Sequence, residues 1–525
     1  MVTAIERPAV TAPAVEPLVL AAADAAVRTV PELLAAATAA RPDAPAVADG
    51  SGVWTYTELS DHARAFADWL AEQGVARGER VLVRVGNRRE FAALLFGTLL
   101  HGAALVPVNP AMKRFHLTTV TADCDPALVV AQGEDTVLLG SLTDRPVHEF
   151  GEVWRRVEEL RAAPPAAEPS AGTAVGPDDL ALLIYTSGST SAPKAVVSTH
   201  APVVFATRSI AQRLGYRADD VVLVAIPVSF DYGLYQLFLS VLAGAQVLLT
   251  EPDRHLRLIG TLQRHRVTVV PVVPSLAEML LRLAGREQGE APPVRLFTNT
   301  GAALTPPVIE ALRSSFPGAE VSPMFGTTEC KRITVLEPGG HVAKPGSVGR
   351  ALPGTEVLVL DEEGQPAPAG AIGEIAARGP HVMTGYWRAP EITAQRFRRD
   401  PVTGVVTLHT GDYGRLDEDG HLYFQGRRDD LFKRRGVRMS SLEIEAAALD
   451  IDGVTAAAAV PPEEGHDLIL FAVTDRTPEE VIELLAERLE GAKVPAECRV
   501  LAALPLTPNG KTDRQLLRQQ AASQN

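Results

Sequence analysis

The most informative stretch of this sequence reads Leu182-Leu183-Ile184-Tyr185-Thr186-Ser187-Gly188-Ser189-Thr190-Ser191-Ala192-Pro193-Lys194. Its apolar start predicts a buried strand, and the hydroxyl side chains around one glycine predict a loop after it. Backbone N–H groups and Ser or Thr hydroxyls in such a loop can bind polyphosphate oxygens, with the lysine as a compact positive charge. The loop lacks the Gly-Lys-Ser/Thr ending of a Walker A motif. It therefore predicts a phosphate-binding loop of another type, with a polar surface turn as the alternative.

Helical and strand patterns alternate on both sides of this stretch. Apolar residues at helical spacing predict helices over 31–40, 57–73 and 89–103, and apolar runs predict strands over 79–85, 104–108, 180–185, 221–226, 246–250, 267–273 and 294–298. Such alternation is typical of layered α/β folds with mostly parallel strands. We therefore expect the α/β class, with layered α/β sheets in a large N-terminal domain.

Changes in composition predict how the chain is divided. Residues 1–27 are rich in Pro and Ala and predict a disordered tail, and the Ala, Pro, Gly and Ser of residues 161–179 predict a linker. Short strand patterns with Gly and Pro turns over 354–379 predict a smaller β-rich subdomain. A dense run of charged residues then predicts the boundary between the large domain, 28–428, and a small mobile α+β C-terminal domain, 429–525.

Composition excludes several classes of protein. The 525 residues include 50 Lys and Arg against 64 Asp and Glu, a formal net charge of −14, which disfavours binding of nucleic acid through its phosphates. The cysteines Cys124, Cys330 and Cys498 are too far apart for a disulfide framework or a cysteine zinc site. Pro and acidic residues interrupt the apolar N-terminal stretch, so it predicts neither export nor a membrane anchor. We expect a cytoplasmic protein with no nucleic acid or membrane partner.

Several further motifs follow in order along the chain. They are Met324-Phe325-Gly326-Thr327-Thr328-Glu329, Gly373-Glu374, residues 379–397 with Gly385-Tyr386-Trp387, Thr410-Gly411-Asp412, Gly426-Arg427-Arg428-Asp429-Asp430 and Leu504-Pro505-Leu506-Thr507-Pro508-Asn509-Gly510-Lys511. With the loop before Lys194, they resemble the adenylate-forming (AMP-binding) superfamily of acyl- and aryl-CoA synthetases, peptide-synthetase adenylation domains and luciferases. The resemblance covers residues 29–515. The chain departs from the family pattern at Ser191 and Ala195, where glycines are usual.

The resemblance implies an enzyme that uses ATP and Mg²⁺, and it implies a role for particular residues. The nucleotide would be bound by Thr186, Ser187, Gly188, Ser189, Thr190, Lys194, Gly301, Ala302, Ala303, Phe325, Gly326 and Asp412. Among them, Phe325 would stack on adenine and Asp412 would accept both ribose hydroxyls. Glu329 would bind the metal ion and Thr328 the α-phosphate. Arg427 would add a donor to the nucleotide, and Lys511 would reach the oxygens where negative charge builds. Asp429 would be the hinge. For any one of these residues alone, a salt bridge or a helix cap is the alternative.

The resemblance implies that one wall of the pocket for the acid is the helix after the strand at 221–226, here residues 229–235. The predicted residues of the pocket are Asp231, Tyr232, Tyr235, Thr298, Thr300, Met324 and Arg332. Phe230-Asp231 resembles the amino-acid-activating members, in which the aspartate pairs with the substrate ammonium. A buried carboxylate without a partner is costly, so a pocket-facing Asp231 implies an amine on the ligand. The alternative is that Asp231 caps a helix, and Gly233 replaces the serine usual in those members.

Arg332 lies three positions after Glu329, the residue that would bind the metal ion, and directly after Lys331. The resemblance implies that Arg332 points into the pocket, and a cation there would suit a second acidic group on the substrate. The alternative is a solvated surface position. Polar and aromatic pocket residues disfavour a long-chain fatty acid.

These expectations together predict an AMP-forming ligase. It would activate a small aromatic or amino-bearing carboxylic acid as an acyl-adenylate, release pyrophosphate, and transfer the acyl group to CoA or to the phosphopantetheinyl thiol of a separate carrier protein. One alternative is an adenylate-forming enzyme that transfers to an amine or activates nitrite to diazotise an aryl amine. Another is a catalytically degenerate nucleotide-binding protein.

Overall fold

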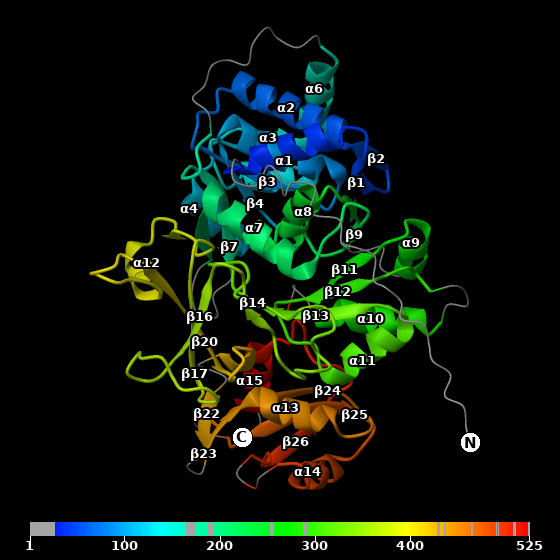
Figure 1. The fold of residues 1–525 in the computed structure, drawn as a ribbon, viewed down its shortest axis with the longest axis vertical. Helices are drawn as coiled ribbons and strands as arrows, with labels where there is room; N and C mark the ends of the chain where they lie inside the picture. The colour runs from blue at the N-terminus through cyan, green and yellow to red at the C-terminus, as the bar shows by residue number, and fades with distance from the viewer. Residues whose placement is uncertain are drawn as a thin grey trace, which may run out of the picture.

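The computed structural model describes residues 27–163, 175–186, 193–251, 257–286, 291–427, 431–434, 437–463, 466–489, 491, 493–507 and 511–522. Within these residues, no helix is both long enough and apolar enough to span a bilayer. The chain runs from the blue N-terminal elements at one end of the molecule to the orange and red C-terminal elements at the other (Figure 1). Val27 is buried, and residues 1–26 of the predicted tail lie outside the described part.

Two large sheets form the framework of the chain before the β-rich part. One has nine strands in the order β15 (Arg350–Ala351), β14 (Thr334–Val335), β13 (Glu320–Phe325), β12 (Leu296–Asn299), β11 (Val269–Val272), β9 (Val221–Val224), β10 (Gln246–Leu249), β1 (Pro45–Asp49), β2 (Gly52–Thr55). The other has seven, in the order β18 (Gly385–Tyr386), β8 (Lys194–Thr199), β7 (Leu180–Thr186), β4 (Ala104–Pro107), β3 (Arg80–Arg84), β5 (Leu128–Ala131), β6 (Val147–Glu149). The central strands of both sheets pair in parallel, whereas β2, β8, β14, β15 and β18 pair antiparallel. The predicted α/β class is confirmed.

Helices cover the faces of these sheets. Those before the β-rich part are α1 (Val30–Ala40), α2 (Tyr56–Glu72), α3 (Arg89–His101), α4 (Arg114–Cys124), α5 (Glu134–Gly140), α6 (Phe150–Ala162), α7 (His200–Leu214), α8 (Asp231–Ala243), α9 (Leu258–Arg264), α10 (Pro274–Ala284) and α11 (Pro306–Ser315). Ala162 still belongs to α6, so the linker predicted from residue 161 begins later, and most of it, 164–174, lies outside the described residues.

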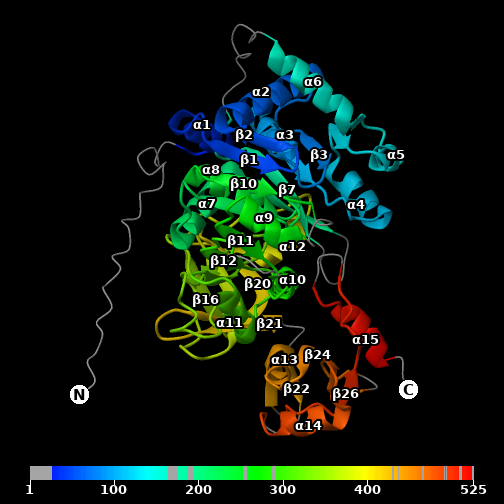
Figure 2. The same cartoon turned by 90° about the vertical axis from the view of Figure 1, so that its right-hand side faces the viewer.

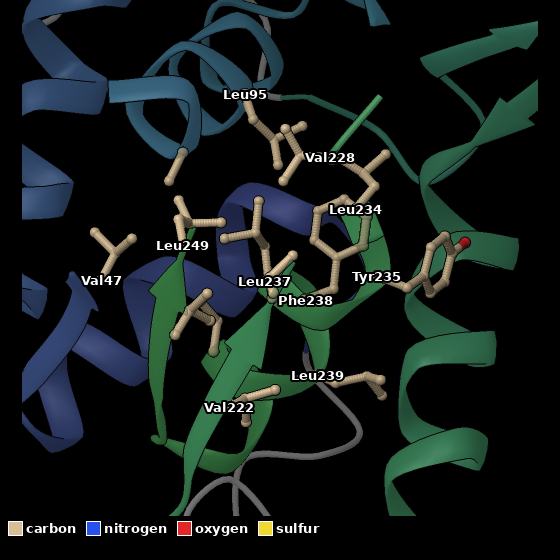
Figure 3. Close-up of a cluster of buried hydrophobic side chains, with 14 of the residues drawn as sticks. Val47, Leu95, Val222, Val228, Leu234, Tyr235, Leu237, Phe238, Leu239 and Leu249 are labelled. Atoms are coloured by element: carbon tan, nitrogen blue, oxygen red, sulfur yellow. The ribbon is translucent and has the colours of Figure 1, made fainter. Parts of the chain in front are cut away.

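Helix α8 lies at the centre of the large core. Every residue from Tyr232 to Ala243 is buried, as expected for a helix that is apolar on all sides. Leu234, Leu237 and Phe238 pack with side chains from the neighbouring strands and helices, and the Tyr235 hydroxyl points away from this aliphatic cluster (Figure 3). The burial of α8 fixes its N-terminal turn, where Asp231 lies.

The remaining elements are smaller, and their bounds are as follows. A five-stranded antiparallel sheet holds β16 (Glu356–Leu360), β17 (Gly373–Arg378), β19 (Phe397–Arg399), β20 (Val406–Leu416) and β21 (Leu422–Arg427), beside α12 (Pro390–Arg396). The C-terminal part holds β22 (Leu431–Arg434), β23 (Val437–Ser440), α13 (Ser441–Leu449), β24 (Val454–Val460), β25 (Ile469–Thr474), α14 (Pro478–Ala486), β26 (Glu497–Val500) and α15 (Arg514–Ala522). Both views place α13, α14 and β26 at the end of the molecule opposite α2 and α6 (Figure 2).

Parallel pairing brings several motif residues to one edge of the nine-stranded sheet. Strands β9, β11, β12 and β13 run in the same direction, so the segments that follow them leave from the same edge. Ligands of open α/β sheets bind at this edge. The segments that follow β9, β12 and β13 carry Asp231, Gly301 and Glu329 respectively.

Candidate active site

The predicted phosphate loop connects two strands that pair with each other. Strands β7 and β8 pair antiparallel with Thr186 opposite Lys194, and the Thr186 hydroxyl donates to the Lys194 carbonyl oxygen at 3.4 Å. Ser187, Gly188, Ser189 and Thr190 lie outside the described residues. The two ends of the loop are therefore held together, and the roles of the residues between them stay predictions.

The chain folds back sharply after β13. A Cβ atom placed on Gly326 would lie 2.2 Å from the Lys331 carbonyl oxygen, so only glycine fits there. The Lys331 amide donates to the Thr327 carbonyl oxygen at 2.7 Å, and Lys331 itself has a φ of 65°, unusual for a residue with a side chain. This turn carries Thr328 and Glu329, both only partly buried, and then directs Lys331 and Arg332 inward.

Glu329 is held at both its main chain and its side chain. The Tyr386 hydroxyl donates to Glu329 Oε1 at 2.5 Å, and the Met383 amide donates to the Glu329 carbonyl oxygen at 2.8 Å. A partly buried carboxylate with one oxygen engaged leaves a hard oxygen ligand for a divalent cation. Mg²⁺ is commonly held by one or two such carboxylates together with substrate phosphates, so these residues fit the predicted metal.

The ribose-binding candidate Asp412 lies on β20 and is buried. The part of the strand before it is held by Glu374, which accepts from the Gly411 amide at 3.0 Å and lies 2.9 Å from His409 Nδ1. Burial alone would raise the pKa of the Glu374 carboxyl, but the hydrogen bonds and charge of His409 and the Gly411 amide lower it below its usual value. Glu374 therefore stays ionised and supports the part of β20 that carries Asp412.

Arg427 lies directly opposite Asp412 in the sheet. Asp412 and Arg427 are paired positions of β20 and β21, so the structure brings these two predicted residues together along the backbone. The side chain of Arg427 and the predicted hinge residue Asp429 lie outside the described part of the structure.

Lys511 reaches across from the C-terminal part to the end of β12. A Cβ atom placed on Gly301 would lie 3.7 Å from Lys511 Nζ, and Gly301 has a φ of 85°. The Lys511 amide donates to Thr507 Oγ1 at 3.2 Å, and its carbonyl oxygen accepts from the Thr507 amide at 2.7 Å. The structure therefore brings Lys511 to the Gly301-Ala302-Ala303 segment, where Ala302 is half-buried and Ala303 exposed.

Phe325, predicted to stack on adenine, packs against another ring of the protein. Its ring centroid lies 5.2 Å from that of Phe424 at an interplanar angle of 29°. Both rings belong to the hydrophobic cluster of the β-rich part. The contact holds β13 against β21, and adenine stacking on Phe325 stays a prediction.

The pocket residues are centred on an ion pair. Arg332 Nη1 lies 3.4 Å from Asp231 Oδ2, and the Arg332 guanidinium lies 4.9 Å from the centroid of the Tyr232 ring. The Tyr232 hydroxyl lies 2.7 Å from the Thr298 carbonyl oxygen and 2.8 Å from its hydroxyl. Thr300 and Met324, at the ends of the neighbouring strands, are buried. Helix α8 has Phe230 as its N-cap and no side-chain cap hydrogen bond, so Asp231 is the first helical residue and does not cap the helix.

Lys331 is the charged residue that sequence reasoning left out of the pocket. Its side chain is fully buried, 5.6 Å from the centroid of the Tyr235 ring, and Nζ has no hydrogen-bond partner among the described residues. Burial lowers the pKa of Lys331 to about 8, although the charges of Asp231 and Glu329 oppose the shift. The sequence feature that could identify Lys331 as a pocket residue is its position in the motif, directly before Arg332.

Gly233 allows α8 to pack closely against the end of β9. A Cβ atom at this position would lie 2.5 Å from the Pro227 carbonyl oxygen and 2.9 Å from that of Ile226. Because backbone atoms cannot swing aside, serine at this position would displace the helix. The glycine thus sets the position of Asp231 and Tyr232 relative to the sheet.

Two family profiles match the chain. The profile of the AMP-binding enzymes matches residues 34–387, and that of the AMP-binding enzyme C-terminal domain matches residues 443–511. Two large synthetases also match the chain. CymA of Salinispora arenicola is 31% identical over 93% of the chain, and pyochelin synthetase PchF of Pseudomonas aeruginosa is 34% identical over 81% of it. The chain spans only 6% and 23% of their respective lengths.

Relatives of similar length also match. The 4-coumarate–CoA ligase of Pinus taeda is 28% identical over 92% of the chain and 93% of its own length. The crystal structure of VinN is 48% identical in sequence, has a TM-score of 0.71, and covers 76% of the chain and 98% of its own. VinN has also been solved in complex with L-aspartate and with 3-methylaspartate.

Proposed function

The chain belongs to the AMP-binding enzyme family, a family of AMP-forming ligases, and we propose that it activates an aspartate-like amino acid. The substrate would carry an ammonium group and a second carboxylate besides the one that is activated. This proposal narrows the small amino-bearing acid predicted from the sequence to an aminodicarboxylate.

The buried ammonium of Lys331, which has no hydrogen-bond partner among the described residues, carries the proposal. Arg332 forms the ion pair with Asp231, whereas Lys331 is subject to the charges of Asp231 and Glu329 without a hydrogen bond to either. An unpaired buried charge is costly, and a ligand carboxylate would relieve that cost. Asp231 would then take the substrate ammonium, and the substrate would replace one weak internal ion pair with two stronger ones.

The complexes of VinN support this choice of substrate class. The structures of VinN in complex with L-aspartate and with 3-methylaspartate are 47% and 45% identical to this chain, and both ligands carry one ammonium and two carboxylates. This is the charge pattern that complements Asp231, Lys331 and Arg332.

The first half-reaction would form the aminoacyl-adenylate. An oxygen of the free substrate carboxylate attacks the α-phosphorus of ATP, the bond to the bridging oxygen breaks, and pyrophosphate leaves with the electron pair. Lys511 and Thr328 would bind the oxygens that gain negative charge, and Asp412 would hold the ribose hydroxyls. A divalent cation held by Glu329 would neutralise phosphate charge.

The second half-reaction would transfer the acyl group to a thiol. The thiolate attacks the acyl carbon, a carbon–sulfur bond forms, and AMP leaves. The acceptor would be CoA or the phosphopantetheinyl group of a carrier protein, since the relatives include a CoA ligase and two large synthetases. We place the enzyme in the cytoplasm, where ATP and reduced thiols are both available.

Acid-dependent pyrophosphate release tests the proposal. The panel contains L-aspartate, 3-methylaspartate, L-asparagine, succinate, and nitrite with an aryl amine. We expect kcat/KM for at least one of the two aspartates to exceed that for asparagine and succinate by about 10²-fold or more, because each analogue leaves a buried charge unpaired. Equal rates with asparagine would contradict the second-carboxylate subsite. Turnover of nitrite with the aryl amine, and of no other member of the panel, would favour diazotisation.

The Asp231→Ala variant tests the ammonium subsite. We expect it to lose the preference for aspartate over succinate, a change of about 2–5 kcal/mol, because it removes one partner of a buried charge pair. Thr305→Ala, a substitution at the N-cap of α11 where no side-chain cap hydrogen bond is made, is the control. Unchanged relative specificity in Asp231→Ala would contradict the assignment.

A further inference from the structure

The side chain of Tyr386 contacts Glu329, the predicted metal ligand. Its hydroxyl donates to Glu329 Oε1 at 2.5 Å, a short bond typical of a charged acceptor. Within the described residues, no other hydrogen bond to this carboxylate is made. Oε1 is therefore engaged, and Oε2 is the oxygen that remains for a cation.

The backbone around Tyr386 holds this contact in place. Strand β18 pairs with β8, with Tyr386 opposite Val196, and the Tyr386 amide donates to Thr393 Oγ1 at 2.9 Å. The Tyr386 ring packs edge-on against Phe397 at 5.6 Å. The Met383 amide also binds the Glu329 carbonyl oxygen, so one short segment fixes both ends of Glu329. The same segment is paired with the strand that returns from the phosphate loop.

We propose that Tyr386 is a positioning residue that makes Glu329 a one-oxygen ligand and thereby favours Mg²⁺ over larger divalent cations. This inference rests on the proposed function, in which Glu329 binds the metal of the metal–ATP complex. Mg²⁺ requires near-octahedral geometry with short bonds and is usually bound by single carboxylate oxygens. Ca²⁺ is larger and readily accepts both oxygens of one carboxylate. Removing the Tyr386 hydroxyl releases Oε1, so that a cation can bind both oxygens of Glu329.

The Tyr386→Phe variant tests the proposal because it removes the hydroxyl and keeps the ring that packs on Phe397. The matched control is Tyr185→Phe. Tyr185 lies on β7 of the same seven-stranded sheet as Tyr386, and its hydroxyl donates to Oδ2 of Asp123 on α4 at 2.6 Å rather than to Glu329. Both variants lose one tyrosine–carboxylate hydrogen bond of similar length.

Calorimetry measures Mg²⁺ and Ca²⁺ binding to each protein in the presence of a non-hydrolysable ATP analogue. We expect Tyr386→Phe to weaken Mg²⁺ binding by about 10- to 100-fold, the usual effect of removing a partner of a metal ligand. Ca²⁺ binding stays equal or tightens, so the Mg²⁺/Ca²⁺ preference changes by at least about tenfold. Tyr185→Phe leaves both affinities at the wild-type values.

The assay of pyrophosphate exchange separates this inference from the proposed function. With an active wild type, we expect Tyr386→Phe to need more Mg²⁺ for half-maximal rate, with the maximal rate nearly retained. An unchanged metal preference, or an equal loss of both metals, would overturn the role of Tyr386. A wild type that exchanges pyrophosphate with no acid of the panel would instead overturn the proposed function, whatever the variant binds.

Discussion

Lys331 carries a charge whose presence depends on pH in the physiological range. Burial lowers the pKa of its ammonium from 10.5 to about 8, so the free enzyme is mostly cationic below pH 8 and mostly neutral above it. Below pH 8 the charge is buried in the folded protein and solvated in the unfolded one. The buried charge therefore lowers the free energy of unfolding at neutral pH. This penalty disappears as pH rises from about 8, the pKa in the folded protein, to 10.5, the pKa in the unfolded one.

We predict that KM for the aspartate-like substrate rises as pH passes above about 8, by up to tenfold per unit, because the free enzyme loses the cation that binds the second carboxylate. The value of kcat changes less, since the bound carboxylate keeps Lys331 protonated. Steady-state kinetics from about pH 6.5 to 9.5 measure both constants.

The Lys331→Met variant is the control for this pH profile. Methionine has similar length and no charge. If KM of the variant still changes with pH, the change is therefore due to the substrate ammonium or to other groups. We expect Lys331→Met to melt at a higher temperature than the wild type without substrate at pH 7, because it removes the buried charge. An identical change of KM with pH in both proteins would contradict the role of Lys331.

For Lys511, we predict that replacement by alanine lowers adenylation by about 10²- to 10³-fold or more while the protein stays folded, because the ammonium is needed where charge builds on phosphorus. Pyrophosphate exchange measures the first half-reaction, and circular dichroism follows the fold. Lys493→Ala removes another lysine of the C-terminal part, one paired with Glu443 at 2.7 Å, and is expected to retain exchange. Near-wild-type exchange in Lys511→Ala would show that the assignment is wrong.

At the scale of elements, the contact between α8 and the end of β9 sets the shape of the pocket. Gly233→Ala places a Cβ atom 2.5 Å from the Pro227 carbonyl oxygen, so the helix must shift. We predict a loss of about 1–3 kcal/mol in the free energy of unfolding, the usual cost of overpacking, together with a higher KM. Thermal melting and kinetics measure the two effects.

The matched substitution for this test is Gly260→Ala in α9. A Cβ atom there meets nothing within 4 Å, so we expect equal or greater stability and an unchanged KM. If Gly233→Ala behaved in the same way as Gly260→Ala, the close packing would have no role in the pocket.

Local sequence patterns account for the elements that could be predicted. The strands β9, β10 and β11 are short apolar runs between breakers, and each lies within a predicted range. The two-residue strands β14, β15 and β18 could not be predicted, because their pairing depends on partners far along the chain. In the same way, the motif placed Glu329 but not its contact with Tyr386, which lies 57 residues away.

In the pocket too, the sequence predicts some residues but not how each side chain is oriented. Resemblance singled out Asp231 and Arg332, and the structure places them within 3.4 Å of each other. Whether Lys331 faces inward depends on its φ of 65°, and no sequence pattern specifies that value for a lysine. The structure excludes the helix-cap alternative for Asp231 because the helix already begins at this residue, one position earlier than that alternative requires.

At the scale of the whole molecule, the described arrangement suits the first half-reaction. Lys511 lies next to Gly301, where it can act in adenylation. In the proposed function a thiol must later reach the same acyl carbon, so we expect the C-terminal part to move between the two half-reactions. The predicted pivot, Asp429, lies in the gap between β21 and β22.

We predict that Asp429→Pro retains pyrophosphate exchange and loses most thioester formation with the correct acceptor. Proline fixes φ near −65°, whereas a hinge needs backbone freedom at a few residues. Asp429→Ala, which keeps that freedom, is the control and should form thioester normally. Loss of both half-reactions by the same factor, or of neither, would show that the hinge lies elsewhere.

The ion pair between Asp231 and Arg332 also constrains how descendants of this protein could acquire a new substrate. A lineage that moves to an uncharged amino acid side chain has to discard positive charge from the pocket. Losing Asp231 first leaves two buried cations, and losing Arg332 first separates Asp231 from its partner, so both first steps cost stability. Losing Lys331 first relieves a charge that already lacks a partner among the described residues. Selection against unstable intermediates would therefore impose an order on the substitutions, with position 331 changing before positions 231 and 332.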